Sequence, residues 1–182
     1  MTEENVYRRL ALHLSALGMG CPANEDLTEI LKENFDPLEA KVALAIPTRV
    51  IPLQPASVHE ISKNVDLPIE DLHIVLERLA EKGLIFSAET DKGEKGYALQ
   101  QCGFSFPQTF FWRGEDTAHS RNMAMLVAKY FNRKVTREAY SSETHAYRYI
   151  PVAGTLKPDT QTVLPYHTME SVIEKATDFA VC

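Results

Sequence analysis

Three cysteines, Cys21, Cys102 and Cys182, are the side chains with the widest chemical range in this sequence. Iron–sulfur clusters and structural zinc ions each take about four protein ligands, usually from closely spaced cysteine pairs. These cysteines lie far apart and form no C-x-x-C pair. They therefore predict neither a four-cysteine cluster nor a disulfide framework within the chain. We interpret Cys21 and Cys102 as small packing residues.

Histidines are the next candidates for chemistry. The six of them show no H-x-x-x-H or H-E-x-x-H spacing that would bring two rings onto one metal: His13, His59, His73, His119, His145 and His167. Ser120 follows His119, and Ser141-Ser142 lie close to His145. Catalytic dyads are assembled by the fold, however, and not by adjacency in the sequence. The sequence therefore favours a chain without catalytic activity of its own.

Two further patterns each have a chemical and a structural interpretation. Residues 18–23 match the G-x-G-x-x-A fingerprint of dinucleotide sites, but here the motif follows a predicted helix instead of a strand, which favours a loop. An aromatic cluster occupies residues 104–112: Phe104, Phe106, Phe110, Phe111 and Trp112. Aromatic side chains can stack on bases or a flat cofactor, yet Arg113 is the only cation nearby. Packing in a core or an interface is therefore favoured.

Composition narrows the class of protein. The chain has 182 residues, 45% of them hydrophobic, and a formal net charge of -6. This acidity disfavours a general binder of nucleic acids or anionic membranes. No apolar run approaches the roughly 20 residues that span a bilayer, and the start Met1-Thr2-Glu3-Glu4 is unlike a basic signal peptide. We therefore expect a globular protein of the cytoplasm without a membrane partner.

Capping signals mark the helices of the central region. Asp36 is a good N-cap, Pro37 suits the first helical position, and Glu39 completes a capping box. The pair Ser57 and Glu60 repeats the same pattern before a short second helix. Both signals predict where a helix begins.

A longer helix and two strands follow. Apolar residues at helical spacing predict the inner face of the helix: Ile69, Leu72, Val75, Leu76 and Leu79. Gly83 ends it, and residues 84–86 and 97–99 are predicted strands joined by a polar turn at 91–96. Helix, helix, longer helix, strand, turn and strand is the order of a winged helix-turn-helix domain. The predicted fold class is therefore α+β and mainly helical.

The remaining sequence predicts helical extensions at both ends. Helices are expected over residues 3–17, after a cap at Asn24 or Asp26, and over 117–132, where two methionines suit an adaptable contact such as a homodimer. The predicted organisation is an N-terminal extension (1–34), a winged-helix domain (35–100), an aromatic segment with a helix and an extended strand (101–152), and a linker with a C-terminal helix (153–182).

DNA is a predicted partner if the longer helix enters a groove, but its charge disfavours this. The helix carries Glu70, Asp71, Glu77 and Glu81 against two cations, whereas phosphate contacts need Lys and Arg. The residues that would contact DNA in this alternative are Lys63, Arg78, Lys82, Lys92 and Lys95. A structural or protein-docking role is favoured for the same helices.

Several stretches resemble a family of bacterial and archaeal 4Fe-4S ferredoxin-type proteins. G-C-P at 20–22, L-T-E-I-L at 27–31 and F-D-P-L-E-A at 35–40 are similar to the start of that family. R-Y-I-P-V at 148–152, V-L-P-Y at 163–166 and F-A-V-C at 179–182 are similar to its segment before a cysteine-rich half. The resemblance spans nearly the whole chain.

The resemblance implies a function that the residues alone do not predict. It implies that this chain is the non-catalytic N-terminal module of an electron-transfer protein, which docks a redox partner or its own C-terminal ferredoxin domain. Cys182 matches the residue that begins the cysteine-rich region, and it would be a cluster ligand only in a longer chain. The resemblance implies that 4Fe-4S clusters are bound by the full-length proteins of that family. No cofactor is expected in these 182 residues.

Overall fold

The computed structural model describes residues 3–17, 20–49, 51, 53–101, 107–111, 114–132 and 174. The chain divides into two units, Met1–Thr144 and His145–Cys182. The helices and strands with defined bounds, between residues 3 and 130, all lie in the first unit. Several predictions fall outside the described residues: Cys102, Phe104, Phe106, Trp112, the extended segment at 137–152, the C-terminal helix and Cys182.

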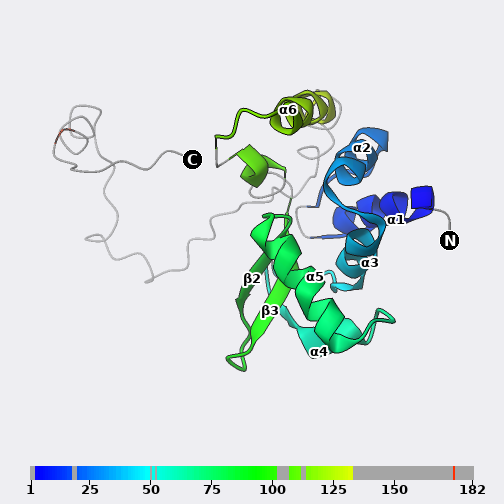
Figure 1. Ribbon diagram of the computed structural model, residues 1–182, viewed down its shortest axis with the longest axis vertical. Helices are drawn as coiled ribbons and strands as arrows, with labels where there is room; N and C mark the ends of the chain where they lie inside the picture. The colour runs from blue at the N-terminus through cyan, green and yellow to red at the C-terminus, as the bar shows by residue number, and fades with distance from the viewer. Residues whose placement is uncertain are drawn as a thin grey trace, which may run out of the picture. The chain divides into compact units, whose positions relative to one another are not determined.

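Three helices form the N-terminal part of the first unit, where α1 packs against both α2 and α3 (Figure 1). They are α1 (Glu3–Ser15), α2 (Glu25–Asn34) and α3 (Pro37–Ala45). α1 has an amphipathic pattern, and it buries Val6, Leu10 and Leu14. Asn24 is the N-cap of α2, because its side chain accepts a hydrogen bond from Leu27 N at 2.8 Å.

The capping box predicted at the start of α3 is confirmed. Asp36 Oδ1 accepts from Leu38 N and Glu39 N, each at 2.8 Å, while Asp36 N donates to Glu39 Oε2 at 2.9 Å. The capping box predicted at Ser57 is only half formed. Ser57 Oγ accepts from Glu60 N at 3.2 Å, but the Glu60 carboxylate turns to Arg49 Nη2, at 2.6 and 2.7 Å.

Helix α4 (Val58–Ser62) and helix α5 (Ile69–Glu81) pack together, and α5 also contacts α3 and β2. The predicted inner face of α5 is confirmed for four residues, which are buried: Leu72, Val75, Leu76 and Leu79. The prediction is wrong for Ile69, which is 45% exposed. Ile69 is the first helical residue, and a terminal turn has packing neighbours on one side only.

The end of α5 confirms the role predicted for Gly83. Gly83 has a φ of +71°, and its N–H donates to Ala80 O at 2.9 Å. Leu84 N donates to Leu79 O at 3.0 Å, which completes a Schellman motif. This motif leads the chain directly into the next strand.

Strands β1 (Ala56–Ser57), β2 (Ile85–Glu89) and β3 (Lys95–Leu99) form an antiparallel sheet in the order β1-β3-β2. The fold is therefore α+β. The predicted β2–β3 hairpin exists, but its strands extend further toward the turn than the sequence predicted. Residues such as Ser87, Glu89 and Gly96 are weak strand formers, and cross-strand pairing overrides their propensity.

Gly96 permits the close approach of β1 to β3. A Cβ at this position would lie 2.8 Å from Ala56 O and 2.7 Å from Thr90 Cγ2. We expect Gly96→Ala to lower the free energy of unfolding by about 1–3 kcal/mol, because neighbouring backbone must move to make room. Urea denaturation would measure this. Ser87→Ala, an exposed change on β2, is the matched control, and equal midpoints for both variants would contradict the prediction.

The last described elements are a short 3-10 helix, η1 (Gln108–Phe111), and α6 (Ala118–Tyr130), which packs against α2. A capping box between Thr117 and Ser120 begins α6. Met123 and Tyr130 are fully buried in a core cluster that includes side chains of every helix from α1 to α6. None of the helices in the described part of the chain is long and apolar enough to cross a membrane.

Candidate functional site: the outer face of helix α5

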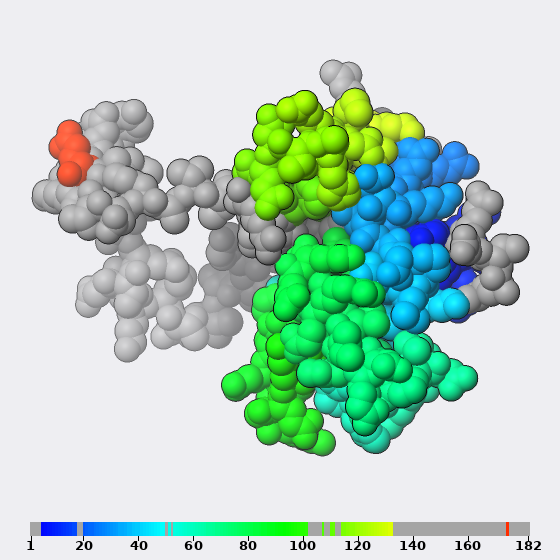
Figure 2. All heavy atoms as spheres, viewed as in Figure 1, coloured from blue at the N-terminus to red at the C-terminus, as the bar shows by residue number. Residues whose placement is uncertain are grey.

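The side of α5 opposite the core is an exposed surface of mixed acidic and apolar character. Glu70, Asp71, Ile74 and Glu81 are all exposed, and Ile74 is exposed by 62%. Figure 2 shows the α5 segment (green) at the surface that faces the viewer. We call these four residues, with Ile69, the α5 face.

Two of the predicted DNA contacts are held by a buried carboxylate. Glu39 is 1% exposed, and its Oε1 lies 2.9 Å from Arg78 Nε and 2.7 Å from Lys82 Nζ. Arg78 Nη2 also lies 3.4 Å from Asp36 Oδ2. The two cations therefore neutralise acidic groups of α3 and do not form a free positive surface for phosphate.

Lys95 is a third predicted DNA contact with a carboxylate partner. Its Nζ lies 2.6 Å from Glu77 Oε1, and the hydroxyl of buried Tyr97 donates to the same oxygen at 2.5 Å. The hydrogen bonds from Lys95 and then Tyr97 hold the pKa of Glu77 below its ordinary value. Burial, and secondarily the hydrogen bond to Glu77, raises the pKa of Tyr97. The cluster ties α5 to β3.

The pKa shift of Glu77 predicts an acid-dependent loss of stability. A carboxyl group with a lowered folded-state pKa stabilises the fold above its unfolded pKa and loses this effect as the pH falls through the folded value. We expect wild-type protein to be more stable than Glu77→Gln at pH 7. The difference should shrink below pH ~4, which is just under the unfolded pKa of Glu. Urea denaturation of both proteins at pH 7 and below pH ~4 measures this difference in the free energy of unfolding. Glu70→Gln is the control, and a difference between wild type and Glu77→Gln that does not change with pH would contradict the prediction.

Lys63 and Lys92 are the remaining predicted DNA contacts. Lys63 is the C-cap of α4, Lys92 lies in the turn between β2 and β3, and both are exposed. In the sequence these two lysines are equivalent to Arg78, Lys82 and Lys95 as predicted DNA contacts. The structure separates them, because carboxylates hold the other three. A signal was available in the sequence, since Glu39 and Lys41 are the two charged residues of a helix that is otherwise apolar.

A cleft of about 520 Å³ lies between the end of α5, strand β2, η1 and the start of α6. Phe110 and Phe111 line it and pack partly against the core, with their rings edge-to-face at 5.2 Å. This geometry agrees with the interpretation of these two aromatic residues as packing residues. Phe86 of β2 lines the same cleft and is 37% exposed.

Ser120 and His119 also line this cleft but do not form a nucleophile–base pair. His119 Nδ1 lies 2.8 Å from Glu33 Oε1, and its ring meets Phe110 edge-to-face. Ser120 Oγ accepts from Thr117 N at 2.7 Å and donates to Thr117 O at 2.9 Å. Both side chains therefore stabilise α6 and its contact with α2.

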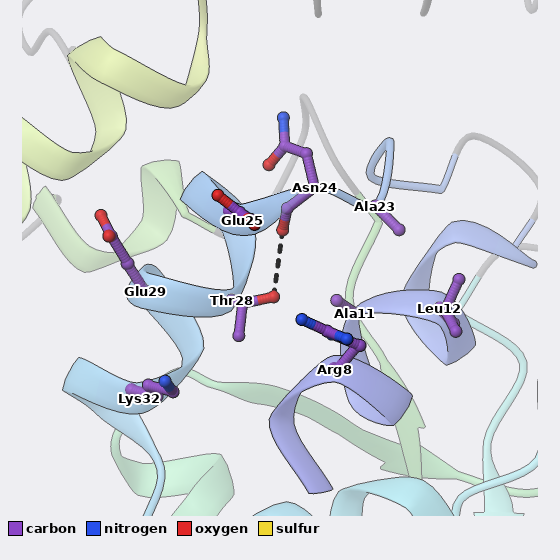
Figure 3. A pocket seen from close by; sticks show the side chains of 9 residues that line it. All are labelled: Arg8, Ala11, Leu12, Ala23, Asn24, Glu25, Thr28, Glu29 and Lys32. Carbon is purple, nitrogen blue, oxygen red and sulfur yellow. Dashed lines mark hydrogen bonds between the residues drawn. The ribbon is translucent and has the colours of Figure 1, made fainter. Parts of the chain in front are cut away.

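A second pocket, of about 540 Å³, lies between α1 and α2 (Figure 3). Arg8 extends from α1 toward Thr28, whose Oγ1 donates to Asn24 O at 3.0 Å. Glu25 and Glu29 also line the pocket and balance the charge of its cations. The mixture of charges favours no particular ligand, and the Asn24 side chain is occupied in capping α2.

The 4Fe-4S clusters implied by the family resemblance do not fit the cysteines of this chain. A cluster takes about four thiolates, whereas the sequence has three cysteines, of which Cys21 is 1% exposed within the core. Within the described ranges, no group of three His, Cys, Asp or Glu side chains is arranged to hold a metal ion. Cys182 lies outside these ranges, so its role stays a prediction.

Comparison with known proteins adds no family to these observations. The chain matches no protein-family model, no curated protein and no solved structure. A function must therefore be supported by the residues of the chain and by their geometry.

Proposed function

We propose that residues 35–100 are a winged-helix domain that docks a protein partner. The order α3, β1, α4, α5, β2, β3, with the sheet order β1-β3-β2, supports this assignment. The observation that carries the docking role is the neutralisation of Arg78, Lys82 and Lys95 by Glu39 and Glu77. It leaves α5 with an acidic, partly apolar outer face.

A partner with a basic surface is complementary to the α5 face. Charges at the rim of an interface mainly speed association and select the partner, while a buried apolar side chain supplies affinity. Glu70, Asp71 and Glu81 provide the charges, and Ile74 is the exposed apolar side chain among them. A docking role of this kind requires a binding surface and no catalytic residue.

We further propose that the docking domain serves a 4Fe-4S ferredoxin-type electron-transfer protein as its N-terminal module. The support is the resemblance at 20–22, 27–31, 35–40, 148–152, 163–166 and 179–182. In this proposal the clusters, held by cysteines beyond Cys182, carry the electrons. The α5 face positions the clusters by binding a redox partner or the cluster domain itself.

The coding sequence downstream of the Cys182 codon tests the iron–sulfur part of the proposal. Repeated C-x-x-C spacings there are the expected result, since a 4Fe-4S cluster needs about four thiolates. A stop codon directly after Cys182 would overturn this part and leave protein docking by the α5 face as the function to be tested.

DNA binding is the alternative function, and the exposed Lys63 and Lys92 favour it. Because phosphate contacts depend strongly on salt, fluorescence anisotropy with a labelled DNA duplex at low salt is a sensitive test. If the protein docks a partner through an acidic α5 face, we expect no binding to the DNA duplex. Salt-dependent binding that is lost in a Lys63→Ala, Lys92→Ala double variant would overturn docking. Lys32→Ala, an exposed lysine on α2, is the matched control.

A further inference from the structure

The outer edge of strand β2 adjoins the cleft that Phe86, Phe110 and Phe111 line. β3 lies between β1 and β2, and within the described residues no strand pairs with the other side of β2. An exposed strand edge offers backbone N–H and C=O groups to an incoming extended chain. The same edge here carries Phe86 beside an open aromatic cleft.

We propose that this edge and cleft bind an extended peptide segment of a partner protein, which adds a fourth strand next to β2. Backbone hydrogen bonds to β2 would supply affinity, and one large apolar side chain of the peptide would enter the cleft. A cleft of about 520 Å³ has room for such a side chain and part of its neighbours. This surface shares Glu81 with the α5 face but does not include Ile74 or the other residues of that face.

The charges around the cleft define the peptide further. The basic side chains that line it already have partners, because Lys82 is bound to Glu39 and the His119 ring contacts Glu33. Glu115 is an exposed carboxylate in the same lining. A peptide with Lys or Arg close to its apolar residue therefore complements the cleft.

A second copy of β2 is a poorer occupant than a basic peptide. The strand has the sequence I-F-S-A-E, which contains no Lys or Arg and ends in Glu89. Antiparallel pairing of two β2 strands would therefore bring no positive charge to Glu115. The favoured partner is another protein that presents a basic, apolar, extended segment.

A display library of random octapeptides tests this proposal, with the full 182-residue chain as bait and Phe86→Lys for counter-selection. The expected peptides carry a large apolar residue with Lys or Arg within about two positions, as strand pairing beside an acidic rim requires. They should lack proline next to that residue, since proline cannot donate to a strand. Failure to enrich peptides over the Phe86→Lys bait would overturn the proposal.

A synthetic peptide from the selection separates strand addition from simple apolar contact. N-methylation of alternate backbone amides in the peptide, and separately Phe86→Ala in the protein, should each weaken binding by about tenfold or more. Met125→Ala, 67% exposed on α6, and Ile74→Ala on the α5 face are matched controls that should leave binding unchanged. Binding that tolerates N-methylation in both registers would overturn strand addition, and a chain dimer abolished by Phe86→Lys would assign the edge to a second copy. Circular dichroism would check that each variant folds.

Discussion

Replacing Arg78 and Lys82 together by alanine is expected to lower the free energy of unfolding by about 3–5 kcal/mol, because a buried carboxylate then loses its charged partners. Glu39 is 1% exposed and Oε1 lies within 2.9 Å of both cations. Among the described residues, only the hydrogen bond from Asp36 N would still satisfy the carboxylate. Equilibrium urea denaturation at pH 7 measures the loss.

The single variants distinguish this explanation from a general effect of surface substitution. Arg78→Ala leaves Lys82 on the carboxylate, and Lys82→Ala leaves Arg78, so each should cost about 1 kcal/mol as a partly exposed pair does. Glu39→Ala should cost only about 1–2 kcal/mol, most of it the lost capping interaction, since both cations are 45% exposed and regain water. A double variant no less stable than Glu39→Ala would contradict the prediction.

Tyr130→Ala is expected to cost about 3–5 kcal/mol, because it removes a fully buried aromatic side chain from the contact between α6 and the N-terminal helices. The Tyr130 hydroxyl also donates to Pro22 O at 3.0 Å, and this carbonyl would lose its donor. Urea denaturation gives the global effect. Hydrogen exchange of the α6 amides shows whether α6 separates from α2 before the rest of the fold opens.

Two variants provide the controls for Tyr130→Ala. Tyr130→Phe keeps the ring and removes only the hydrogen bond, so it should cost about 1 kcal/mol. Met125→Ala changes the same helix at a residue that is 67% exposed, and it should stay within about 0.5 kcal/mol of wild type. Equal losses of unfolding free energy in Tyr130→Ala and Met125→Ala would show that α6 is not anchored through its buried face.

The two methionines of α6 illustrate how packing changes the meaning of a sequence feature. They suggested an adaptable contact with a second copy of the chain. Met123 is fully buried, however, and its Sδ lies 3.1 Å from Asn34 Nδ2 of α2. Met125 is exposed and remains available for such a contact. A homodimer through this helix stays a prediction.

The sequence by itself determined most helix ends of the described region. Asp36 caps α3, Ser57 caps α4, and Gly83 ends α5, as their types and spacing predict. Such signals can be read locally, because a cap bonds to backbone groups within about three or four residues of itself. The two-residue strand β1 gave no such signal, since its structure comes from pairing with β3, where Ala56 lies opposite Tyr97, 41 residues further along the chain.

Only the tertiary structure decided which charged residues are available to a partner. The sequence shows Arg78, Lys82 and Lys95 as three cations near an acidic helix. Their partners, Glu39 and Glu77, lie on elements that packing brings together from distant positions. Charge counting treats every ionisable side chain as solvated, whereas burial of Glu39 requires a compensating cation. The fold thereby converts a candidate DNA surface into an acidic face.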